Sequence, residues 1–583
     1  MSAQQLITEH IDLWTSSIKA RNTQGRGSSK KRELYGIKKL RELILELAVR
    51  GKLVPQYPND EPASELLKRI AAEKEQQIKD KKIKKQKSPP IITDEKKPFE
   101  LPEEWEWCSL SAICILENGD RSKNYPNKSV LVEEGIPFVN AGHLQGGRID
   151  RNEMTYIPED RFNLLKAGKF SDGDILFCLR GSLGKSAIVD GFEKGAIASS
   201  LVIVRLIGSL NHWYIHNYFD SPFSYRQIKQ YDNGTAQPNL SAADLGKFLV
   251  PVPPSEEQRR IVAKVDELMA HCDQLEQQTE SSLDAHQLLV DTLLSTLTDS
   301  RDAKELSDNW TRLADHFDTL ITTDYAVEQL KQTILQLAIQ GNLVPQDPND
   351  EPASELLKRI AAEKKQLIKD KKIKNQKSIL VITDEEKPFG IPEGWKWSRI
   401  GDIGIGSTGK TPSTKVSEYF DGNIPFIGPG QITPSGELLD SDKTLTEEGL
   451  EFSTEAVEGD LLMVCIGGSI GKSTVTAKRV AFNQQINSLR PIIVISSYVH
   501  KAVSTNVFFQ SVRDHSTGSA TPIINRSKWE ELLVPTPPLA EQYRIVAKVD
   551  ELMTICDQLK ARLNDAQATQ LHLADVMVHD SVG

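Results

Sequence analysis

Residues 53–107, LVPQYPNDEPASELLKRIAAEKEQQIKDKKIKKQKSPPIITDEKKPFELPEEWEW, return almost unchanged as residues 343–397, LVPQDPNDEPASELLKRIAAEKKQLIKDKKIKNQKSILVITDEEKPFGIPEGWKW, with 43 of 55 positions identical. A second pair follows: PVPPSEEQRRIVAKVDELMAHCDQL at residues 251–275 returns as PTPPLAEQYRIVAKVDELMTICDQL at residues 535–559, identical at 19 of 25 positions. The chain is therefore an internal duplication, which predicts two similar structural halves.

The segments between the repeats have diverged. Residues 108–250 and 398–534 span 143 and 137 residues and share only scattered landmarks. All parts of a duplicated segment have had the same time to change, so the unequal divergence indicates that the sequences of these parts are constrained unequally. Either the repeats simply form slowly changing helices, or they meet the same partner twice while the two inserts meet different targets.

Bulk properties describe a multidomain globular protein without an obvious affinity for nucleic acid. The 583 residues leave room for about four domains at ~150 residues each. The net charge of −10 argues against a chain that binds DNA by itself, so DNA contacts would need local basic faces or charge from partner subunits. We find no signal peptide, no bilayer-length apolar run and no C-x-x-C pair among the six cysteines, and expect buried thiols, no membrane contact and a cytoplasmic location.

Long helices are predicted after each insert. Residues 253–258, PPSEEQ, place prolines before an acidic first turn, as at a helix N-terminus. Apolar residues then step by four and three, which is typical of a coiled coil; these are Ile261, Val265, Leu268, Cys272 and Leu275, and in the second copy Ile545, Val549, Leu552, Cys556, Leu559 and Leu563. A helix of ~40 residues is ~60 Å long.

Further helices are predicted before each insert. Residues 40–48 and 330–338 are helical in pattern and are followed by Gly51 and Gly341, as at a helix C-cap. A second helix, residues 62–87, ends in a lysine run that recurs at residues 369–377. These lysines are equally compatible with a solvated linker and with phosphate contacts.

The inserts read as mixed α/β segments with many short strands edged by Gly, Asn or Asp. The predicted strands are residues 136–139, 174–177 and 200–204 in insert one and residues 424–427, 460–463 and 488–492 in insert two. Both inserts are therefore predicted to share a fold.

Several motifs resemble functional sites without the context that these sites need. Residues 404–411, GIGSTGKT, satisfy a phosphate-loop pattern, but the next residues are poor helix formers, which argues against nucleotide binding. Residues 181–186 and 468–473 are predicted glycine turns that present a lysine, suited equally to a phosphate contact and to a plain β-turn. We find no amino-methyltransferase motif, nuclease core or zinc cluster, so the chain is not expected to be an enzyme by itself.

A combination of motifs is more specific than any of these. Four segments occur in order: residues 43–56 (LILELAVRGKLVPQ), P-x-x-W-x-W at 102–107, GTAQPNLS at 234–241 and P-x-P-P-x-x-E-Q-x-R-I-V-A-K-V-D-E-L from 251. Their counterparts recur in the second half. The whole chain resembles the specificity (S, HsdS-type) subunits of type I restriction-modification enzymes. The second copy departs at residues 518–525, GSATPIIN, where Thr521 and Ile523 replace Gln237 and Asn239.

The resemblance implies an α+β architecture with two similar mixed α/β target recognition domains separated by an antiparallel coiled coil, in a circular pseudo-twofold arrangement. The implied domains are an N-terminal helical repeat region (1–101), recognition domain 1 (102–255), a central helical region (256–391), recognition domain 2 (392–538) and a C-terminal coiled-coil helix (539–583).

It also implies a function and partners. Each recognition domain would read one half of a bipartite asymmetric target in double-stranded DNA, and the repeats would dock two modification (M) subunits that methylate adenine. Restriction (R) subunits would add ATP-dependent cleavage. No cofactor is expected on this chain, with S-adenosylmethionine, ATP and Mg²⁺ on the partners. The alternative is a non-catalytic coiled-coil adaptor with two ligand-binding inserts.

Polar and basic side chains in the glycine-rich loops are the candidate DNA contacts, because Arg and Lys suit guanine or phosphate while Asn and Gln suit adenine. In insert one these are Arg121, Lys123, Asn140, His143, Arg180, Lys185, Asn233 and Gln237. In insert two they are Lys410, Thr411, Gln431, Lys472, Gln484, Gln485, Thr517 and Thr521.

Overall fold

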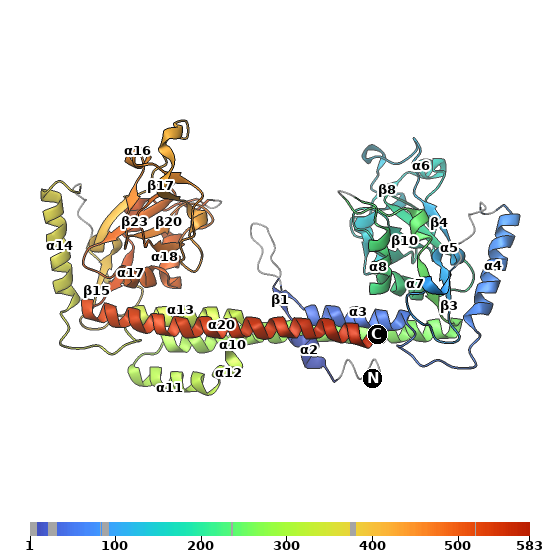
Figure 1. Cartoon of the computed structure of the whole chain (residues 1–583), viewed down its shortest axis with the longest axis horizontal. Coiled ribbons are helices and arrows are strands. Elements are labelled where there is room, and N and C mark those ends of the chain that lie inside the picture. Colours follow the sequence, from blue (N-terminus) through green and yellow to red (C-terminus); the bar gives the residue numbers. More distant parts are fainter. Residues whose placement is uncertain are drawn as a thin grey trace. The chain divides into compact units, whose positions relative to one another are not determined.

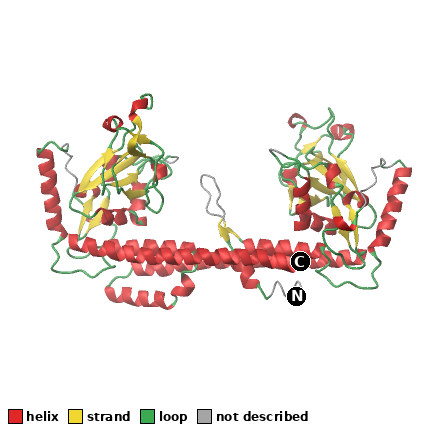
Figure 2. Ribbon diagram, in the orientation of Figure 1, coloured by secondary structure: helices red, strands yellow, loops and turns green. Residues whose placement is uncertain are grey.

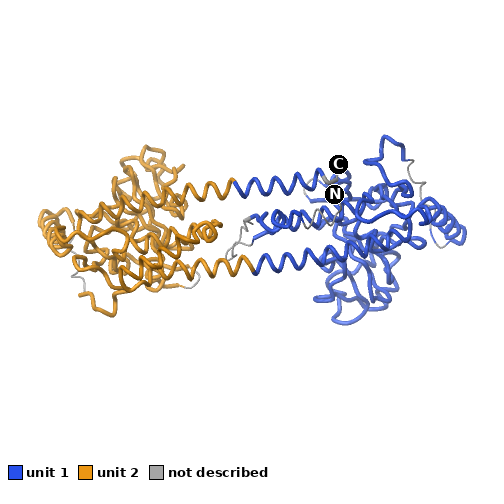
Figure 3. Tube along the Cα trace, turned by 90° about the horizontal axis from the view of Figure 1, so that it is seen from below, with its two compact units in different colours: residues 1–281, 566–583 blue, residues 282–565 orange. Residues whose placement is uncertain are grey.

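The computed structural model describes residues 9–20, 32–81, 83, 92–234, 237–373, 381–518 and 521–582. It divides into two compact units, coloured separately in Figure 3: unit 1 comprises residues 1–281 and 566–583, and unit 2 comprises residues 282–565. The helix α10 (Ser255–Thr298) begins in unit 1 and ends in unit 2, whereas α20 (Leu539–Val582) begins in unit 2 and ends in unit 1. Each unit therefore contains the start of one long helix and the end of the other.

In unit 1 the repeat helix α3 (Tyr35–Val49) contacts both long helices. The Arg41 guanidinium donates to Asp273 in the first half of α10 at 2.9 Å, and the Tyr35 hydroxyl donates to Asp575 near the end of α20 at 2.7 Å. The remaining helical repeat elements of this unit are α2 (Ile11–Ser16) with the short strands β1 (Lys19–Ala20) and β2 (Arg32–Glu33), and α4 (Ala63–Lys79).

In unit 2 the repeat helix α13 (Asp324–Gln340) makes the corresponding contacts. Lys331 pairs with Asp557 in the first half of α20 at 2.5 Å, and Tyr325 donates to Asp291 near the end of α10 at 2.8 Å. The two units thus repeat one arrangement with the long helices exchanged, which confirms the predicted circular pseudo-repeat. The remaining helices of this unit's repeat region are α11 (Ala303–Asp315), α12 (Phe317–Leu320) and α14 (Ala353–Lys369).

The helix directions follow from the order of contacts within unit 2. Along α13, Glu328 pairs with Lys560 and Lys331 with the earlier Asp557, so α13 runs antiparallel to α20. The last part of α10 runs parallel to α13, because Asp291 lies near Tyr325 and the Thr298 carbonyl near Gln340. The two long helices are therefore antiparallel here, as predicted.

The predicted 4-3 seam is shared among three helices. Ile545, Val549 and Cys556 of α20 are buried against α13 and against Val290 and Leu294 of α10. A third helix covers the seam because α13 is amphipathic and presents its own apolar stripe. All six cysteines, including Cys272 and Cys556, are free and buried, as expected.

The helices that precede the inserts are shorter than their sequence pattern suggests. The helix predicted over residues 62–87 ends at Lys79, and α14 ends at Lys369. Most of the lysine run, namely Lys82, Lys84, Lys85 and Lys87, and its counterparts Lys374 and Lys377, lies outside the described residues. Among the described helices, none combines the length and apolar character needed to cross a membrane.

The first insert folds into two main sheets with short helices (Figures 1 and 2). The six-stranded sheet has the order β4-β13-β10-β11-β7-β6, and the four-stranded sheet has the order β8-β5-β12-β9. The strands are β4 (Cys114–Asn118), β5 (Ile136–Val139), β6 (Leu144–Gln145), β7 (Gly147–Ile149), β8 (Tyr156–Ile157), β9 (Lys169–Ser171), β10 (Ile175–Cys178), β11 (Ser186–Ile188), β12 (Lys194–Ile197) and β13 (Leu201–Leu206). The helices are α5 (Leu110–Ile113), α6 (Glu159–Leu164), α7 (His212–Asp220), α8 (Pro222–Tyr231) and α9 (Ala242–Leu245).

The second insert repeats this plan. Its two four-stranded sheets have the orders β16-β23-β20-β21 and β18-β17-β22-β19. The strands are β16 (Gly404–Thr408), β17 (Phe420–Ile427), β18 (Thr444–Leu445), β19 (Glu455–Ala456), β20 (Leu461–Val464), β21 (Ser473–Val475), β22 (Val480–Phe482) and β23 (Ile486–Pro491). The helices are α15 (Ile400–Ile403), α16 (Glu447–Glu451), α17 (Ser496–Val503), α18 (Asn506–His515) and α19 (Arg526–Glu530).

The two inserts share one scaffold, as predicted. In each, the first and last strands pair: β3 (Glu106–Ser109) with β14 (Leu249–Val252), and β15 (Lys396–Arg399) with β24 (Leu533–Thr536). The central strands β10 and β20 are fully buried apolar runs, which explains why they were recognisable in the sequence. The phosphate-loop pattern at 404–411 is mostly strand β16, paired with β23, and no α-helix begins over the described residues 409–416 that follow the strand.

Candidate nucleic-acid interface

In unit 1, loops from distant parts of insert one meet where several strands of the six-stranded sheet end. The pairings of β13 with β4 and β10 bring the end of β4, the end of β10 and the start of β13 together. Leu179, just after β10, donates its N–H to the Ser200 carbonyl at 2.8 Å and accepts from the Leu240 N–H at 2.9 Å. The segment before α9 therefore joins the same edge, which we call loop edge 1.

Most of the candidate residues of insert one lie on or beside loop edge 1. Arg121 and Lys123 follow β4, Arg180 and Lys185 lie in the glycine turn between β10 and β11, and Asn233 and Gln237 lie in the segment before α9; all six are exposed. The turn contains Gly181 at φ +77° and Gly184 at φ +89°, values that favour glycine. The predicted glycine turn is confirmed, and it leaves the Lys185 ammonium exposed to solvent.

The other two candidates occupy a short helical turn after β5. The Asn140 side chain accepts from the Gly142 N–H at 2.8 Å, and the His143 ring accepts from the Asn140 N–H at 3.1 Å. Asn140 is half-buried, and its neighbour Val139 accepts from Ala198 beside loop edge 1. His143 is only 7% exposed and its second ring nitrogen lies 3.3 Å from the Glu153 carbonyl, so this side chain braces the turn.

Unit 2 has a matching edge, loop edge 2, with different side chains. Cys465, after β20, donates its N–H to the Gln485 carbonyl at 2.7 Å and accepts from the Ile524 N–H at 3.0 Å. Thr411 donates to the Gln484 side chain at 2.5 Å, and the Gln485 amide oxygen accepts from Asn483 at 3.2 Å. These bonds connect four loops that are widely separated in the sequence.

The candidates of insert two gather on this edge. Lys410, Thr411, Gln484, Thr517 and Thr521 are exposed, while Lys472 and Gln485 are half-buried. Gln431 lies apart in the turn after β17, where its side-chain oxygen accepts from the Gly428 N–H at 3.0 Å. It occupies the place that His143 has in insert one.

Three residues of the loop edges were not among the candidates. Asn239 accepts a hydrogen bond from Arg180, and Ile466 and Ile523 form the corresponding bridge in unit 2. The replacement of Asn239 by Ile523 is visible in the repeat alignment. The pairing of Arg180 with Asn239, and of Ile466 with Ile523, depends on contacts across about 60 residues that periodicity does not reveal.

A second set of contacts joins each insert to its long helix and is nearly identical in the two units. In unit 1 the buried Glu257 carboxylate accepts from the Gln56 amide and from the Trp105 indole, both at 3.0 Å. Nearby, Arg260 pairs with Asp60 at 2.6 Å. Burial raises the pKa of Glu257, and the two hydrogen bonds oppose that rise.

The corresponding junction in unit 2 has the same atoms in the same roles. Glu541 accepts from Gln346 at 3.1 Å and from the Trp395 indole at 2.9 Å, and Arg544 pairs with Asp350 at 2.6 Å. Burial again raises the pKa of Glu541. Glu257 and Glu541 lie in the first turn of their long helices, so these contacts fix the direction of the helix relative to the insert within each unit.

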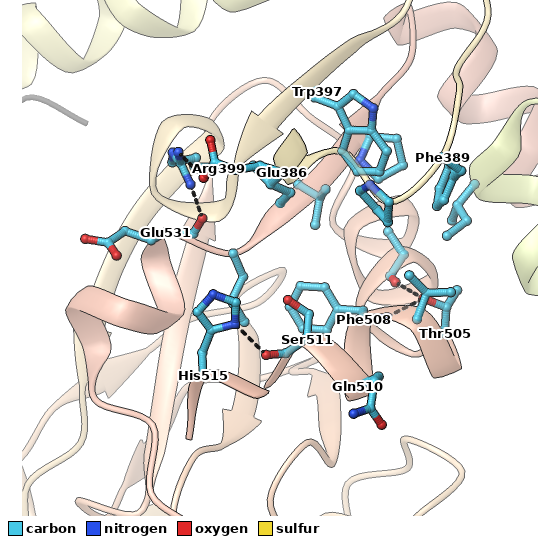
Figure 4. A pocket seen from close by; sticks show the side chains of 18 of the residues that line it. Glu386, Phe389, Trp397, Arg399, Thr505, Phe508, Gln510, Ser511, His515 and Glu531 are labelled. Atoms are coloured by element: carbon cyan, nitrogen blue, oxygen red, sulfur yellow. Dashed lines mark hydrogen bonds and ion pairs between the residues drawn. The ribbon is translucent and has the colours of Figure 1, made fainter. Parts of the chain in front are cut away.

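Beside the unit 2 junction lies a cavity of about 420 Å³, shown in Figure 4. Phe389, Trp397 and Phe508 form its apolar wall, and Gln510, Ser511 and His515 line the polar side. In unit 1, Phe223 packs against Trp107 and Phe99, with ring centroids 5.7 and 5.2 Å away. In the second copy the smaller Val507 stands at the position of Phe223 and lines the cavity.

None of these places has the chemistry of a metal site. Among the residues that the structure describes, no group of three or more His, Cys, Asp or Glu side chains is arranged to hold a metal ion. The loop edges instead offer exposed hydrogen-bonding side chains of the kinds that read base edges.

Comparison with known proteins gives a consistent result. A family model described as "Type I restriction modification DNA specificity domain" matches residues 102–285 and 392–566. The specificity subunit of the Escherichia coli type I restriction enzyme EcoAI is 41% identical, with all of both chains covered, and that of EcoEI is also 41% identical over 99% of both chains. A crystal structure of the HsdS subunit from Thermoanaerobacter tengcongensis is 18% identical, with a TM-score of 0.39, 83% of this chain and 98% of that chain being covered. On the family model and the full-length relatives, this chain belongs to the family of type I restriction-modification DNA specificity subunits.

Proposed function

We propose that each insert reads one half of a bipartite, asymmetric DNA sequence, and that the repeated helical regions hold two modification subunits of an adenine methyltransferase. The observation that carries this proposal is the contrast between the helical repeats and the loop edges. The junctions at Glu257 and Glu541 and the exposed helices α4 and α14 use nearly the same residues in both units, whereas the equivalent loop edges present different side chains. The repeated exposed helices suit one partner met twice, and the loop edges suit two different half-sites.

The exposed helices α4 and α14 support the docking of two copies of one partner. Both have 17 residues, and their sequences differ only at Glu75/Lys365 and Gln77/Leu367. In each helix three side chains are buried, at Ala63, Leu66 and Ile70 and at the equivalent positions of α14. The outer faces therefore present nearly the same surface in each unit.

Partner subunits also account for the chemistry that this chain does not supply. S-adenosylmethionine would be bound by the modification subunits, and ATP with Mg²⁺ by restriction subunits that cleave DNA. The partners would contribute most phosphate contacts, which resolves the net charge of −10. Phosphate contacts position a protein on DNA, whereas contacts to base edges give sequence specificity. The candidate side chains on the loop edges would serve the second purpose, and their contact with DNA remains a prediction.

An exchange of inserts tests the proposal. Residues 392–534 are replaced by the corresponding segment of the EcoAI specificity subunit, and the methylated sequence is determined by genome-wide detection of methyladenine in cells with this chain's own modification subunit. We expect one half of the methylated motif to change and the other half to remain. The reciprocal exchange of residues 102–250 is the matched control and should change only the other half. A change in both halves, or in neither, would contradict the proposal.

A further inference from the structure

The tips of the two loop edges contain a pair of residues in equivalent positions with opposite chemistry. Gly181 donates its N–H to the Pro238 carbonyl in unit 1, and Gly467 donates to the Pro522 carbonyl in unit 2. Next to these bonds, Arg180 faces Asn239 in an isolated antiparallel bridge. In unit 2 the same kind of bridge joins Ile466 and Ile523. The backbone geometry is thus the same, while the side chains differ.

The pair in unit 1 is built for hydrogen bonding. Arg180 is exposed, and its Nε donates to the Asn239 side-chain oxygen at 2.9 Å. This bond holds the guanidinium plane by one edge and leaves the two terminal amino groups directed away from Nε. Two parallel N–H groups match the O6 and N7 acceptors of guanine in the major groove, which is the commonest specific contact of arginine.

The pair in unit 2 has no side-chain donor or acceptor. Ile523 is 40% exposed, and Ile466 beside it is half-buried. The surrounding positions of loop edge 2 are polar, among them Lys472, Gln484 and Thr521, so the two isoleucines form an apolar spot in a hydrophilic rim. The apolar feature that a base pair presents in the major groove is the 5-methyl group of thymine.

We propose that this bridge position sets the base chemistry of each half-site: Arg180, positioned by Asn239, reads a guanine, and Ile523 with Ile466 reads the methyl group of a thymine. This inference rests on the proposed function, since it deepens the reading of two half-sites by the two inserts. It assigns specificity to Ile466 and Ile523, whose apolar side chains a search for polar loop residues overlooks, and a positioning role to Asn239, which was not among the candidates.

Modified bases provide the test, with the full chain in complex with its modification subunits and DNA that contains the methylated motif. Each thymine of the half-site read by insert two is replaced in turn by uracil, which lacks the methyl group. Each guanine of the other half-site is replaced by 7-deazaguanine, which lacks N7. We expect one uracil to weaken binding about fourfold, the value of one buried methyl group, and one deazaguanine to weaken it about 5- to 150-fold.

The variants Ile523→Ala and Arg180→Ala link the effects to the side chains. Ile523→Ala should bind thymine and uracil DNA equally while it still discriminates against deazaguanine. Arg180→Ala should show the reverse. Each variant thereby controls for the folding of the other, because the unaltered insert must keep its discrimination.

The inference is overturned if uracil is tolerated at every position, if half-site two contains no thymine, or if Ile523→Ala retains the preference for thymine. It is also overturned if 7-deazaguanine is tolerated at every guanine of the other half-site, if that half-site contains no guanine, or if Arg180→Ala retains the preference for guanine. These failures differ from a failure of the proposed function, which would appear in the insert exchange as an unchanged motif or a change in both halves.

Discussion

The junctions are nearly the same in the two units, whereas the loop edges carry different side chains. At the junctions, Trp105 and Trp395 donate to Glu257 and Glu541 at 3.0 and 2.9 Å, and the accompanying ion pairs have equal lengths of 2.6 Å. At the loop edges, an arginine–asparagine pair faces an isoleucine pair across the same backbone bridge. The comparison teaches that one scaffold can keep its buried junctions constant while the side chains of its exposed loops change freely.

The largest expected effect concerns the nearly identical outer faces of α4 and α14. Ala72 and its equivalent Ala362 are exposed, so arginine at either position should leave the fold intact and obstruct a docked partner. We expect Ala72→Arg or Ala362→Arg alone to release one modification subunit and the double variant to release both. Native mass spectrometry of the assembled complex measures this directly. Retention of both subunits by the double variant would show that these faces are not the docking surface.

An intermediate effect is expected at the junctions. Glu541→Ala leaves the buried indole N–H of Trp395 without its acceptor, which costs about 1–3 kcal/mol. Glu257→Ala should cost the same in unit 1, since its contacts match. Chemical denaturation of the full chain compares the two variants. Markedly unequal losses of unfolding free energy would show that the two junctions are not equivalent.

The same carboxylates predict a pH dependence. Burial raises the pKa of Glu541, so between its ordinary and its raised value the folded chain binds more protons than the unfolded chain. Stability contributed by this group therefore falls as pH rises through that window. Glu541→Gln should lessen the fall in Tm as the pH rises across the acidic range. An unchanged profile of Tm against pH would show that Glu541 does not cause this pH dependence.

The smallest effect is expected for the turn lysines. Lys185 and Lys472 follow equivalent glycine turns, and one is exposed while the other is half-buried. If each contacts phosphate, alanine should weaken binding to all sequences alike and lower the salt slope by about one. DNA titrations at several salt concentrations measure the salt slope of each variant. Full affinity with an unchanged slope would assign the lysines to plain β-turns.

Local patterns predicted the scaffold well because burial acts on neighbouring residues. The apolar runs of β5, β10 and β20 and the 4-3 seam of α20 were visible in the sequence, as were the glycine turns at 181–186 and 468–473. The ends of α4 and α14 were harder to place, because a lysine-rich helix and a lysine-rich loop have the same composition.

The loop edges could be predicted only in part. Polar residues near glycine are recognisable one by one, but His143 shows the weakness of that approach, since its ring is buried and both nitrogens are engaged. The partner of Arg180 lies 59 residues away in the chain and is set by sheet pairing. Such contacts follow from tertiary structure, which a loop's own composition does not encode.

The charges along the repeat helices differ between the two units. In unit 2, Glu328 pairs with Lys560, whereas the equivalent positions in unit 1, Lys38 and Glu276, have the opposite signs and pair instead with Glu33 and Arg41. If α3 took the place of α13 during folding, Lys38 would face Lys560. That like-charge contact costs a few tenths of a kcal/mol, and the Glu328–Lys560 pair gains a similar amount. The charges at these positions therefore favour α13 over α3 beside α20, and so they help each of two similar helices to pack against its own partner.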